Sequence, residues 1–411
     1  MRLDRLRRGF RALDPWARFA VVLWAAILLL LAVRVAVKPH SRNLYPIWAT
    51  AGADWFAGSG KLYQRTGERD NLLDTFRYSP FVAATLVPWQ FLPERVGGVV
   101  WRFFNAGVFL GAAYWWLRAA APAVLSARRK AIFFLLLAPL ALTSLNNGQV
   151  NALVIGFLLA ALASVARERW WLAAVFIALA TSLKIYPLSV GLLLAVCYPR
   201  AFAGRLLVAL FAVVLLPFAL QQPDYVLVQY QQWLALLADG DRKSWPLHMT
   251  YRDLWLLLRV LDVSISPATY QIIQIASGAA CAAVCVFGRW RGQPLRQVLI
   301  VVLSLGSCWM LLLGPATESA TYILLASVLA WTLVAERLGI VKILSVGGAV
   351  LLLACLIAGW FPGTADFHAR GFHPLGTLLI ASGSIIAALR RPEFPVNEDV
   401  ARVENVAPLA A

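Results

Sequence analysis

Long apolar runs alternate with short polar segments along nearly the whole chain. Many of these runs approach the roughly 20 residues that an α-helix needs to cross a bilayer. We expect about twelve membrane-spanning helices on this basis, near residues 17–37, 98–118, 131–146, 150–166, 171–186, 187–199, 205–220, 268–288, 297–313, 320–335, 342–360 and 373–389. The pattern therefore predicts an all-α polytopic membrane protein.

One apolar segment, SPFVAATLVPWQFLP at residues 79–93, is short and bounded by prolines. We expect it to form a re-entrant or surface-lying helix instead of a span. This choice keeps basic connections such as ARRK, at residues 127–130, on the side of the N-terminus. Lys and Arg concentrate in cytoplasmic loops, so both termini are expected in the cytoplasm. We therefore expect a single plasma-membrane (inner-membrane) domain over residues 1–390, with an uncleaved first span, and a short cytoplasmic tail at 391–411.

Composition supports this class. The chain of 411 residues is 61% hydrophobic and 14% charged, whereas soluble domains average about 45–50% and about 25%. The net charge of +17 comes largely from the short connections, which is the pattern of orientation signals. We therefore expect the lipid bilayer as partner and no nucleic acid. The five cysteines lie in or beside apolar runs, so a disulfide framework is not expected.

The chemically varied residues fall mainly in two long loops, at residues 39–97 and 221–267, on the expected outer side. In the first loop, Ile47, Ala51 and Trp55 share a helical face with Trp48, which predicts an amphipathic juxtamembrane helix lying on the membrane. Asp54 would border its apolar face. Partial burial raises the pKa of a carboxylate and suits it to act as a general base; a solvated helix face is the alternative.

The stretch NNGQVN gathers amides between two apolar runs, with Gly148 as a turn and Gln149 and Asn151 at the start of the next helix. Asn147 is suited to capping that helix. Capping needs one amide, so the others are candidates for binding sugar hydroxyls, or a phosphate at the helix N-terminus.

Lys184 lies at the outer end of an expected span, followed by Tyr186. A lysine at membrane depth is costly unless it is paired or hydrated, and an ammonium at headgroup level suits the phosphate of a lipid-linked substrate. Snorkelling to the interface is the alternative. Arg77 and Tyr78 precede Pro80 and fit either a phosphate contact or an interfacial anchor.

Two further clusters complete the outer side. His248, Tyr251, Arg252 and Asp253 precede an apolar run. Arg252 suits a phosphate, and the alternative is that Arg252 and Asp253 only form ion pairs with neighbours. Glu318 and Tyr322 stand at the entrance to a span, and an acid at that depth is again costly. His368 and His373 are five residues apart, which is not a helix-face spacing for metal ligands, so no metal site is expected.

These segments together resemble glycosyltransferase family 87, the polyprenol-phosphate-mannose-dependent mannosyltransferases of the membrane-embedded C-type fold. The resemblance covers about residues 40 to 390, and is carried by AGSGKLY, FRYSPFVAATLVPWQFLP, NNGQVNALVIGFLLAALA and LKIYPLSVGLLLAV. The segments TYRDLWLLLRVL and GPATESATYILL match only loosely. The resemblance implies a polyprenyl-phosphate sugar donor, with mannose the expected sugar. It further implies a glycan or glycolipid acceptor at the outer face, and no cofactor is expected.

The resemblance also implies roles for individual residues. Cations at Lys184, Arg77 and Arg252 would hold the donor phosphate, and Gln149 and Asn151 would bind the phosphate or the sugar. The remaining residues expected to line the donor site are Tyr78, Tyr186, His248, Tyr251 and Tyr322.

One departure from the family pattern concerns the base. The family carries an acid early in the first outer loop, whereas this chain reads SRNLYPIW, with Asn43 near that place. An asparagine cannot accept a proton. Either Asp54 or Glu318 has taken over this role, or transferase activity has been lost. Of the two acids, we expect Asp54 to deprotonate the acceptor hydroxyl as it attacks the anomeric carbon.

Two other classes remain open. A transporter or flippase for a polar lipid or sugar would need charges through the middle of its spans, whereas most charges here gather at the ends of the runs. An inactive membrane scaffold is consistent with Asn43. The clustering of polar residues on one side favours the enzyme, and a nucleotide-sugar donor fits less well because that side faces away from the cytoplasm.

Overall fold

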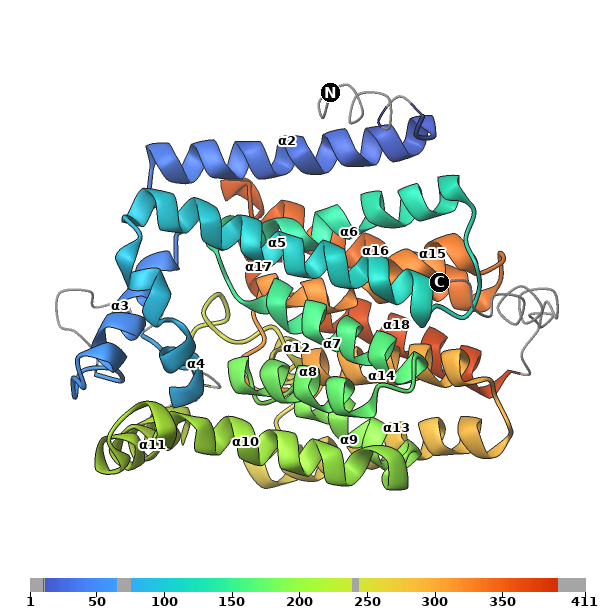
Figure 1. The fold of residues 1–411 in the computed structure, drawn as a ribbon. Helices are drawn as coiled ribbons and strands as arrows, with labels where there is room; N and C mark the ends of the chain where they lie inside the picture. The colour runs from blue at the N-terminus through green and yellow to red at the C-terminus, as the bar shows by residue number, and fades with distance from the viewer. Residues whose placement is uncertain (1–9, 11, 65–74, 239–243, 391–411) are drawn as a thin grey trace, which may run out of the picture.

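A computed structural model describes residue 10 and residues 12–64, 75–238 and 244–390. Within these ranges the chain forms helices and connections, and no strand is present. Figure 1 shows the long helices running side by side in one bundle. The predicted all-α class is therefore confirmed. The expected tail at 391–411 lies outside the described residues.

The helices of the first half begin with a long apolar one and enclose a short, broken segment. They are α2 (Pro15–Val37), α3 (Tyr45–Phe56), α4 (Pro80–Thr85), η1 (Val87–Phe91), α5 (Glu94–Ala119), α6 (Ala127–Asn147), α7 (Asn151–Ala166), α8 (Trp170–Leu183), α9 (Leu188–Cys197), η2 (Pro199–Ala203) and α10 (Gly204–Leu220). Each expected span from 17–37 to 205–220 thus corresponds to a helix.

The second half contains α11 (Pro223–Ala238), α12 (Leu254–Val260), α13 (Pro267–Trp290), α14 (Leu295–Leu313), η3 (Ser319–Leu325), α15 (Ala326–Ala335), α16 (Ile340–Ala358), η4 (Pro362–Thr364), α17 (Ala365–Arg370) and α18 (His373–Leu389). Helix starts follow local chemistry, since the Ser266 hydroxyl accepts from the Thr269 N–H and Pro267 takes the first turn of α13. Helix α11 lies within a segment that we expected to be a loop.

Seven of the described helices are long and apolar enough to cross a membrane, namely α2, α5, α6, the continuous segment Pro199–Leu220, α13, α14 and α16. Five further apolar helices are shorter. The outer helices expose large apolar side chains, including Leu29 and Leu30 of α2 at 62% and 69%, as expected for surfaces that face lipid. The chain is therefore a multi-pass membrane protein.

Segment 79–93 breaks into α4 and η1, of six and five residues. Neither is long enough to cross a bilayer, so the prediction that this segment is not a continuous span is confirmed. Helix α3 forms where an amphipathic helix was expected, but its apolar face is directed inward. Trp48 and Trp55 are buried, and a Cβ on Gly52 would lie 2.4 Å from the Leu86 carbonyl oxygen. The α3 face that we expected on the membrane thus packs on segment 79–93.

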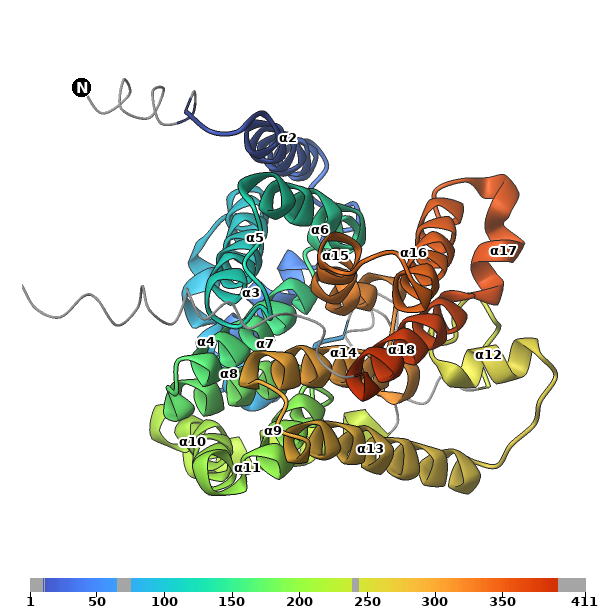
Figure 2. The ribbon, with the colours of Figure 1, turned by 90° about the vertical axis from the view of Figure 1, so that its right-hand side faces the viewer.

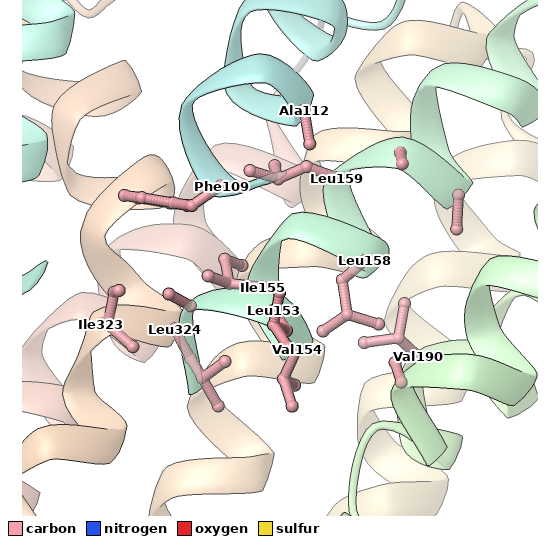
Figure 3. Close-up of a cluster of buried hydrophobic side chains, with 14 of the residues drawn as sticks. Phe109, Ala112, Leu153, Val154, Ile155, Leu158, Leu159, Val190, Ile323 and Leu324 are labelled. Atoms are coloured by element: carbon pink, nitrogen blue, oxygen red, sulfur yellow. The ribbon is translucent and has the colours of Figure 1, made fainter. Parts of the chain in front are cut away.

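Helix α7 forms the centre of the bundle. Its apolar side chains are buried on nearly all sides and contact α5, α8 and η3. Figure 3 shows Ile155, Leu158 and Leu159 of α7 in a cluster with Phe109 of α5 and other buried residues. A helix enclosed in this way has no amphipathic pattern. Its first residue, Asn151, therefore has a fixed position at the end of the core.

Candidate active site at the start of the central helix

The connection between α6 and α7 is a tight turn at Gly148. Its φ of 70° is left-handed, a conformation that glycine adopts without steric cost. The Gly148 carbonyl oxygen accepts two indole N–H groups, from Trp48 at 3.1 Å and from Trp101 at 2.8 Å. The turn is thus held from α3 and from α5.

The amides of this turn do not cap α7. The residue that precedes the helix is Val150, and no side chain caps it, so the capping role considered for Asn147 is wrong. Instead, the Asn151 Nδ2 donates to the Gln149 Oε1 at 2.7 Å, and the Gln149 Nε2 donates to the Glu318 Oε2 at 3.0 Å. The Asn151 Oδ1 is buried and has no protein partner. The amides therefore form a chain that ends on a carboxylate.

Glu318 is held at the start of η3 by a reciprocal pair of bonds. Its carboxylate accepts from the Thr321 backbone N–H, while the Thr321 hydroxyl accepts from the Glu318 N–H at 3.1 Å. Just before it, Ala316 has a φ of 60°, which is strained for a residue with a Cβ. Capping explains part of this geometry, but it leaves the Gln149 contact unexplained.

A cation and two phenols are influenced by the charge of this carboxylate. Lys184 follows the last turn of α8 in an extended conformation, and its Nζ lies 5.4 Å from the Tyr186 ring centroid. Burial lowers the pKa of Lys184, and the nearby Glu318 carboxylate offsets part of this shift. Burial also raises the pKa of Tyr78 and of Tyr186, and the Glu318 charge adds to both shifts. These contributions place the four groups in one electrostatic environment.

Arg77 lies beside this group, next to Tyr78 in the chain. Its Nη1 donates to the Tyr251 hydroxyl at 3.4 Å, and its carbonyl oxygen accepts from the Trp233 indole of α11 at 3.1 Å. The Tyr78 ring packs against Trp48, with 4.6 Å between centroids. The structure therefore brings together the predicted residues Arg77, Tyr78, Gln149, Asn151, Lys184, Tyr186 and Tyr251 with Glu318.

Asp54, the other candidate for the base, lies near the end of α3. The groups that act on its carboxylate are the Ser59 hydroxyl and Lys61, and its carbonyl oxygen accepts from the Tyr225 hydroxyl at 3.4 Å. Burial raises the pKa of Asp54, and Ser59 and Lys61 offset part of that shift. Asp54 thus has the shifted pKa that we expected, but its contacts differ from those of the Glu318 group.

We predict a small pH-dependent effect of Asp54→Asn on stability. Because the folded pKa of Asp54 is raised, the ionised form is less favoured in the folded protein than in the unfolded chain, and this cost grows as the pH rises above the unfolded value of 3.8. The variant should therefore be slightly more stable at neutral pH, by less than about 0.5 kcal/mol because solvent screens the group. Thermal midpoints in nanodiscs should converge below pH 3.8. A variant less stable at neutral pH would contradict the prediction.

Arg252 and Tyr322 form an anchor for the second long loop. The buried Arg252 guanidinium donates to the carbonyl oxygens of Leu247, His248 and Ala369 at 3.1, 3.2 and 2.9 Å. Its backbone N–H donates to the Thr317 oxygen at 2.7 Å, and its own carbonyl accepts from the Tyr322 hydroxyl at 2.7 Å. These bonds hold the loop against the Glu318 segment, and the phosphate contact of Arg252 stays a prediction. His248 contributes a carbonyl, and its side chain is exposed.

Asn43 is hydrogen-bonded to Arg102, which was not among the expected site residues. The Arg102 Nη1 donates to the Asn43 Oδ1 at 3.1 Å and to the Gly98 oxygen at 2.9 Å, and the Nη2 donates to the Asn146 oxygen at 2.7 Å. Arg102 is 1% exposed, and these three acceptors are uncharged. The sequence did contain a signal for Arg102, since it lies inside the apolar run 98–118. An arginine there is costly unless it has a structural or functional role.

Within the described ranges, no group of three or more His, Cys, Asp or Glu side chains is arranged to hold a metal ion. The His368 Nδ1 lies 3.1 Å from the Cys355 carbonyl oxygen. His373 is fully buried, and its ring packs against Tyr322 at 4.9 Å between centroids. The two histidines thus support the anchor region.

Comparison with known sequences identifies the class. The sequence model of glycosyltransferase family 87 matches residues 76–315, more than half of the chain. A polyprenol-phosphate-mannose-dependent alpha-(1-2)-phosphatidylinositol pentamannoside mannosyltransferase of Mycolicibacterium smegmatis is 27% identical over an alignment of 311 residues, which covers 72% of this chain and 70% of the relative. The helical bundle and this match together define a membrane glycosyltransferase. The chain belongs to glycosyltransferase family 87.

The matched range contains Arg77, Gln149, Asn151 and Lys184. Glu318 lies three positions beyond its end. The family match therefore covers the amides and cations of the candidate site, while the position of Glu318 beside them comes from the structure.

Proposed function

We propose that this glycosyltransferase transfers mannose from a polyprenyl-phosphate donor to a hydroxyl of a glycan or glycolipid at the outer face of the membrane. The observation that carries the proposal is the 3.0 Å hydrogen bond between Gln149 and Glu318. The charge of the same carboxylate also acts on the Lys184 ammonium. The candidate site thus combines one acid, one cation and two amides at the end of a buried helix. The printed name of the relative, which is polyprenol-phosphate-mannose-dependent, supports the donor.

In this proposal Glu318 is the general base. Its carboxylate takes the proton of the acceptor hydroxyl as that oxygen bonds to the anomeric carbon of mannose. The bond from the anomeric carbon to the phosphate oxygen breaks, and its electron pair leaves with polyprenyl phosphate. The phosphate gains one negative charge, which Lys184 and Arg77 stabilise. Gln149 holds the carboxylate in place, and the unpartnered Asn151 Oδ1 accepts a hydrogen bond from a sugar hydroxyl.

The orientation follows from the distribution of charge. Figure 1 shows α3, α4 and α11 at the end of the bundle where α2 stops, and the α5–α6 connection at the end where α2 begins. The helix ends on either side of that connection carry Arg118 of α5 and Arg128, Arg129 and Lys130 of α6. By the positive-inside rule, the second end is cytoplasmic and the Glu318 group faces outward. In this arrangement the twelve apolar helices cross the membrane, α3 is juxtamembrane and both termini are cytoplasmic.

We expect membranes that contain the protein to transfer labelled mannose from a polyprenyl-phosphate donor into a new glycan or glycolipid. Lys184→Ala should lower kcat/KM at least about tenfold, because it removes a cation from the developing phosphate charge. Asp54→Asn should retain activity within about threefold, since a residue outside the site affects transition-state binding little. The amount of folded protein, measured by size-exclusion chromatography in detergent, serves as the control.

Two outcomes would redirect the assignment. Loss of transfer in Asp54→Asn, with the protein folded, would assign the general base to Asp54 of α3 in place of Glu318. If folded protein transferred neither mannose nor any other lipid-linked sugar, the transporter or scaffold class would replace the enzyme.

A further inference from the structure

A cavity opens at the corner between α12 and α13. It encloses about 460 Å³, and its lining includes Ser244, Trp255, Arg259, Asp262, Ser264 and Ile265. Figure 2 shows α12 at the edge of the bundle near α17 and α18, with the chain continuing outward before it enters α13. The cavity is separate from the Glu318 group, and the reaction described above does not use it.

The lining has the chemistry of a carbohydrate site. An indole offers a flat apolar surface for the C–H face of a pyranose ring. A guanidinium that only donates and a carboxylate that only accepts can together bond neighbouring hydroxyls, which do both. Arg259 and Asp262 also balance each other in charge. A neutral polyhydroxyl ligand fits this pair better than a phosphate, which the carboxylate would repel.

The side chains of this cavity are held in place. The Arg259 Nη1 donates to the Trp245 carbonyl oxygen at 2.7 Å and to the Thr250 hydroxyl at 3.0 Å. The Trp255 ring packs edge-on against Tyr270, with 5.2 Å between centroids. Asp262 has a φ of 56°, which is strained for a non-glycine residue. Arg259 and Trp255 are fixed by these contacts and lose little freedom when they bind a ligand, whereas Asp262 is exposed.

Two hydrogen bonds connect the cavity with the segment that carries Glu318. The Tyr270 hydroxyl donates to the Leu312 oxygen at 3.3 Å, at the end of α14. The Arg252 N–H donates to the Thr317 oxygen at 2.7 Å, just before α12 begins. Seven residues of α12 at about 1.5 Å each span about 10 Å, so Arg259 lies roughly that far along α12 from the anchor. Helix α12 and Arg252 thus link the cavity to the segment that carries Glu318.

We infer that this cavity binds neutral pyranose residues of the acceptor glycan, remote from the hydroxyl that receives the new sugar. The term acceptor rests on the transferase function proposed above, whereas the binding of a neutral glycan does not. The acceptor in this account is an oligosaccharide that extends from Glu318 to Trp255. A single sugar would occupy one site only.

The test measures binding apart from catalysis. Purified full-length protein in nanodiscs would be titrated with three neutral disaccharides, mannobiose, isomaltose and lactose, and observed by saturation-transfer difference NMR. We expect at least one to bind, and Trp255→Ala and Asp262→Asn each to weaken it about tenfold, the loss expected from removing a stacking platform or a fixed hydrogen bond. Trp290→Ala is the matched control, since Trp290 is 82% exposed at the other end of α13.

The outcomes separate this inference from the transferase proposal. Glu318→Gln should bind the disaccharide as the unmodified protein does. If the disaccharide bound but no sugar were transferred, the inference about the cavity would stand and the transferase proposal would be rejected. No binding at millimolar concentration, or equal binding in Trp255→Ala, would overturn the inference. So would preferential binding of inositol phosphate dependent on Arg259, which would indicate a lipid headgroup. Asp262→Asn, at an exposed position, keeps the test valid if Trp255→Ala does not fold.

Discussion

Replacing Glu318 with glutamine should reduce the rate of sugar transfer at least about 100-fold, the lower range for loss of a general base. The side chains have nearly the same shape, and the single amide oxygen at position 318 can still accept from Gln149 or from the Thr321 N–H. It cannot take the proton of the acceptor. The loss should therefore appear in kcat, with little change in KM for the donor.

The measurement is single-turnover transfer of labelled mannose by purified protein in nanodiscs. Thermal unfolding serves as a fold control, because Glu318 also caps η3. Asp54→Asn is the matched comparison, a carboxylate changed to its amide outside the site. If Glu318→Gln retained full activity while Asp54→Asn lost it, the assignment of the base would be reversed.

Arg102→Leu should destabilise the folded protein by about 1–3 kcal/mol. The substitution leaves the buried Asn146 carbonyl oxygen without its donor, and an acceptor orphaned in this way costs about 1–3 kcal/mol. The Asn43 Oδ1 loses the Arg102 bond but still accepts from the Tyr45 N–H at 3.2 Å. The Gly148 turn borders the guanidinium, since a Cβ on Gly148 would lie 3.4 Å from the Arg102 Nη1. Activity should fall as well, because Gln149 loses its fixed position.

Arg118→Leu is the matched control for this second prediction. Arg118 lies in the last turn of the same helix, is exposed, and donates to the Tyr114 hydroxyl at 3.2 Å. Its loss should change stability by less than about 0.5 kcal/mol. Thermal unfolding of both variants in nanodiscs gives the comparison. Equal midpoints would show that Arg102 does not hold the turn.

The positions of the long helices were predictable from the sequence because apolar runs of spanning length have few other stable arrangements in a bilayer. That segment 79–93 is not a continuous span was also predictable, since it is short and bounded by Pro80 and Pro93, but its division into two short helices was not predicted. The inward face of α3 was not, because a hydrophobic stripe packs equally well against lipid and against protein. Helix α11 was not predicted, because glutamines among its apolar residues interrupt the apolar run.

The site was predictable in composition but not in pairing. Gln149, Asn151 and Lys184 stood out because polar groups are costly near the membrane. Which acid meets them depends on a contact between residues 169 positions apart, and no local pattern encodes such a contact. Arg252 shows the reverse problem. Its charge suggested an anion, whereas the structure surrounds it with backbone carbonyls.

The Gly148 turn also bears on the order in which the protein is made. The bonds that hold it come from Leu44, Trp48, Trp101 and Arg102, all of which leave the ribosome before residue 149. Glu318 follows 169 residues later. A nascent chain therefore has every part needed to shape the turn while it still lacks the acid, and chains fold progressively from the N-terminus during synthesis. If Glu318 is the base, as proposed, catalytic competence is a late event in biogenesis, reached when η3 docks onto the Gly148 turn.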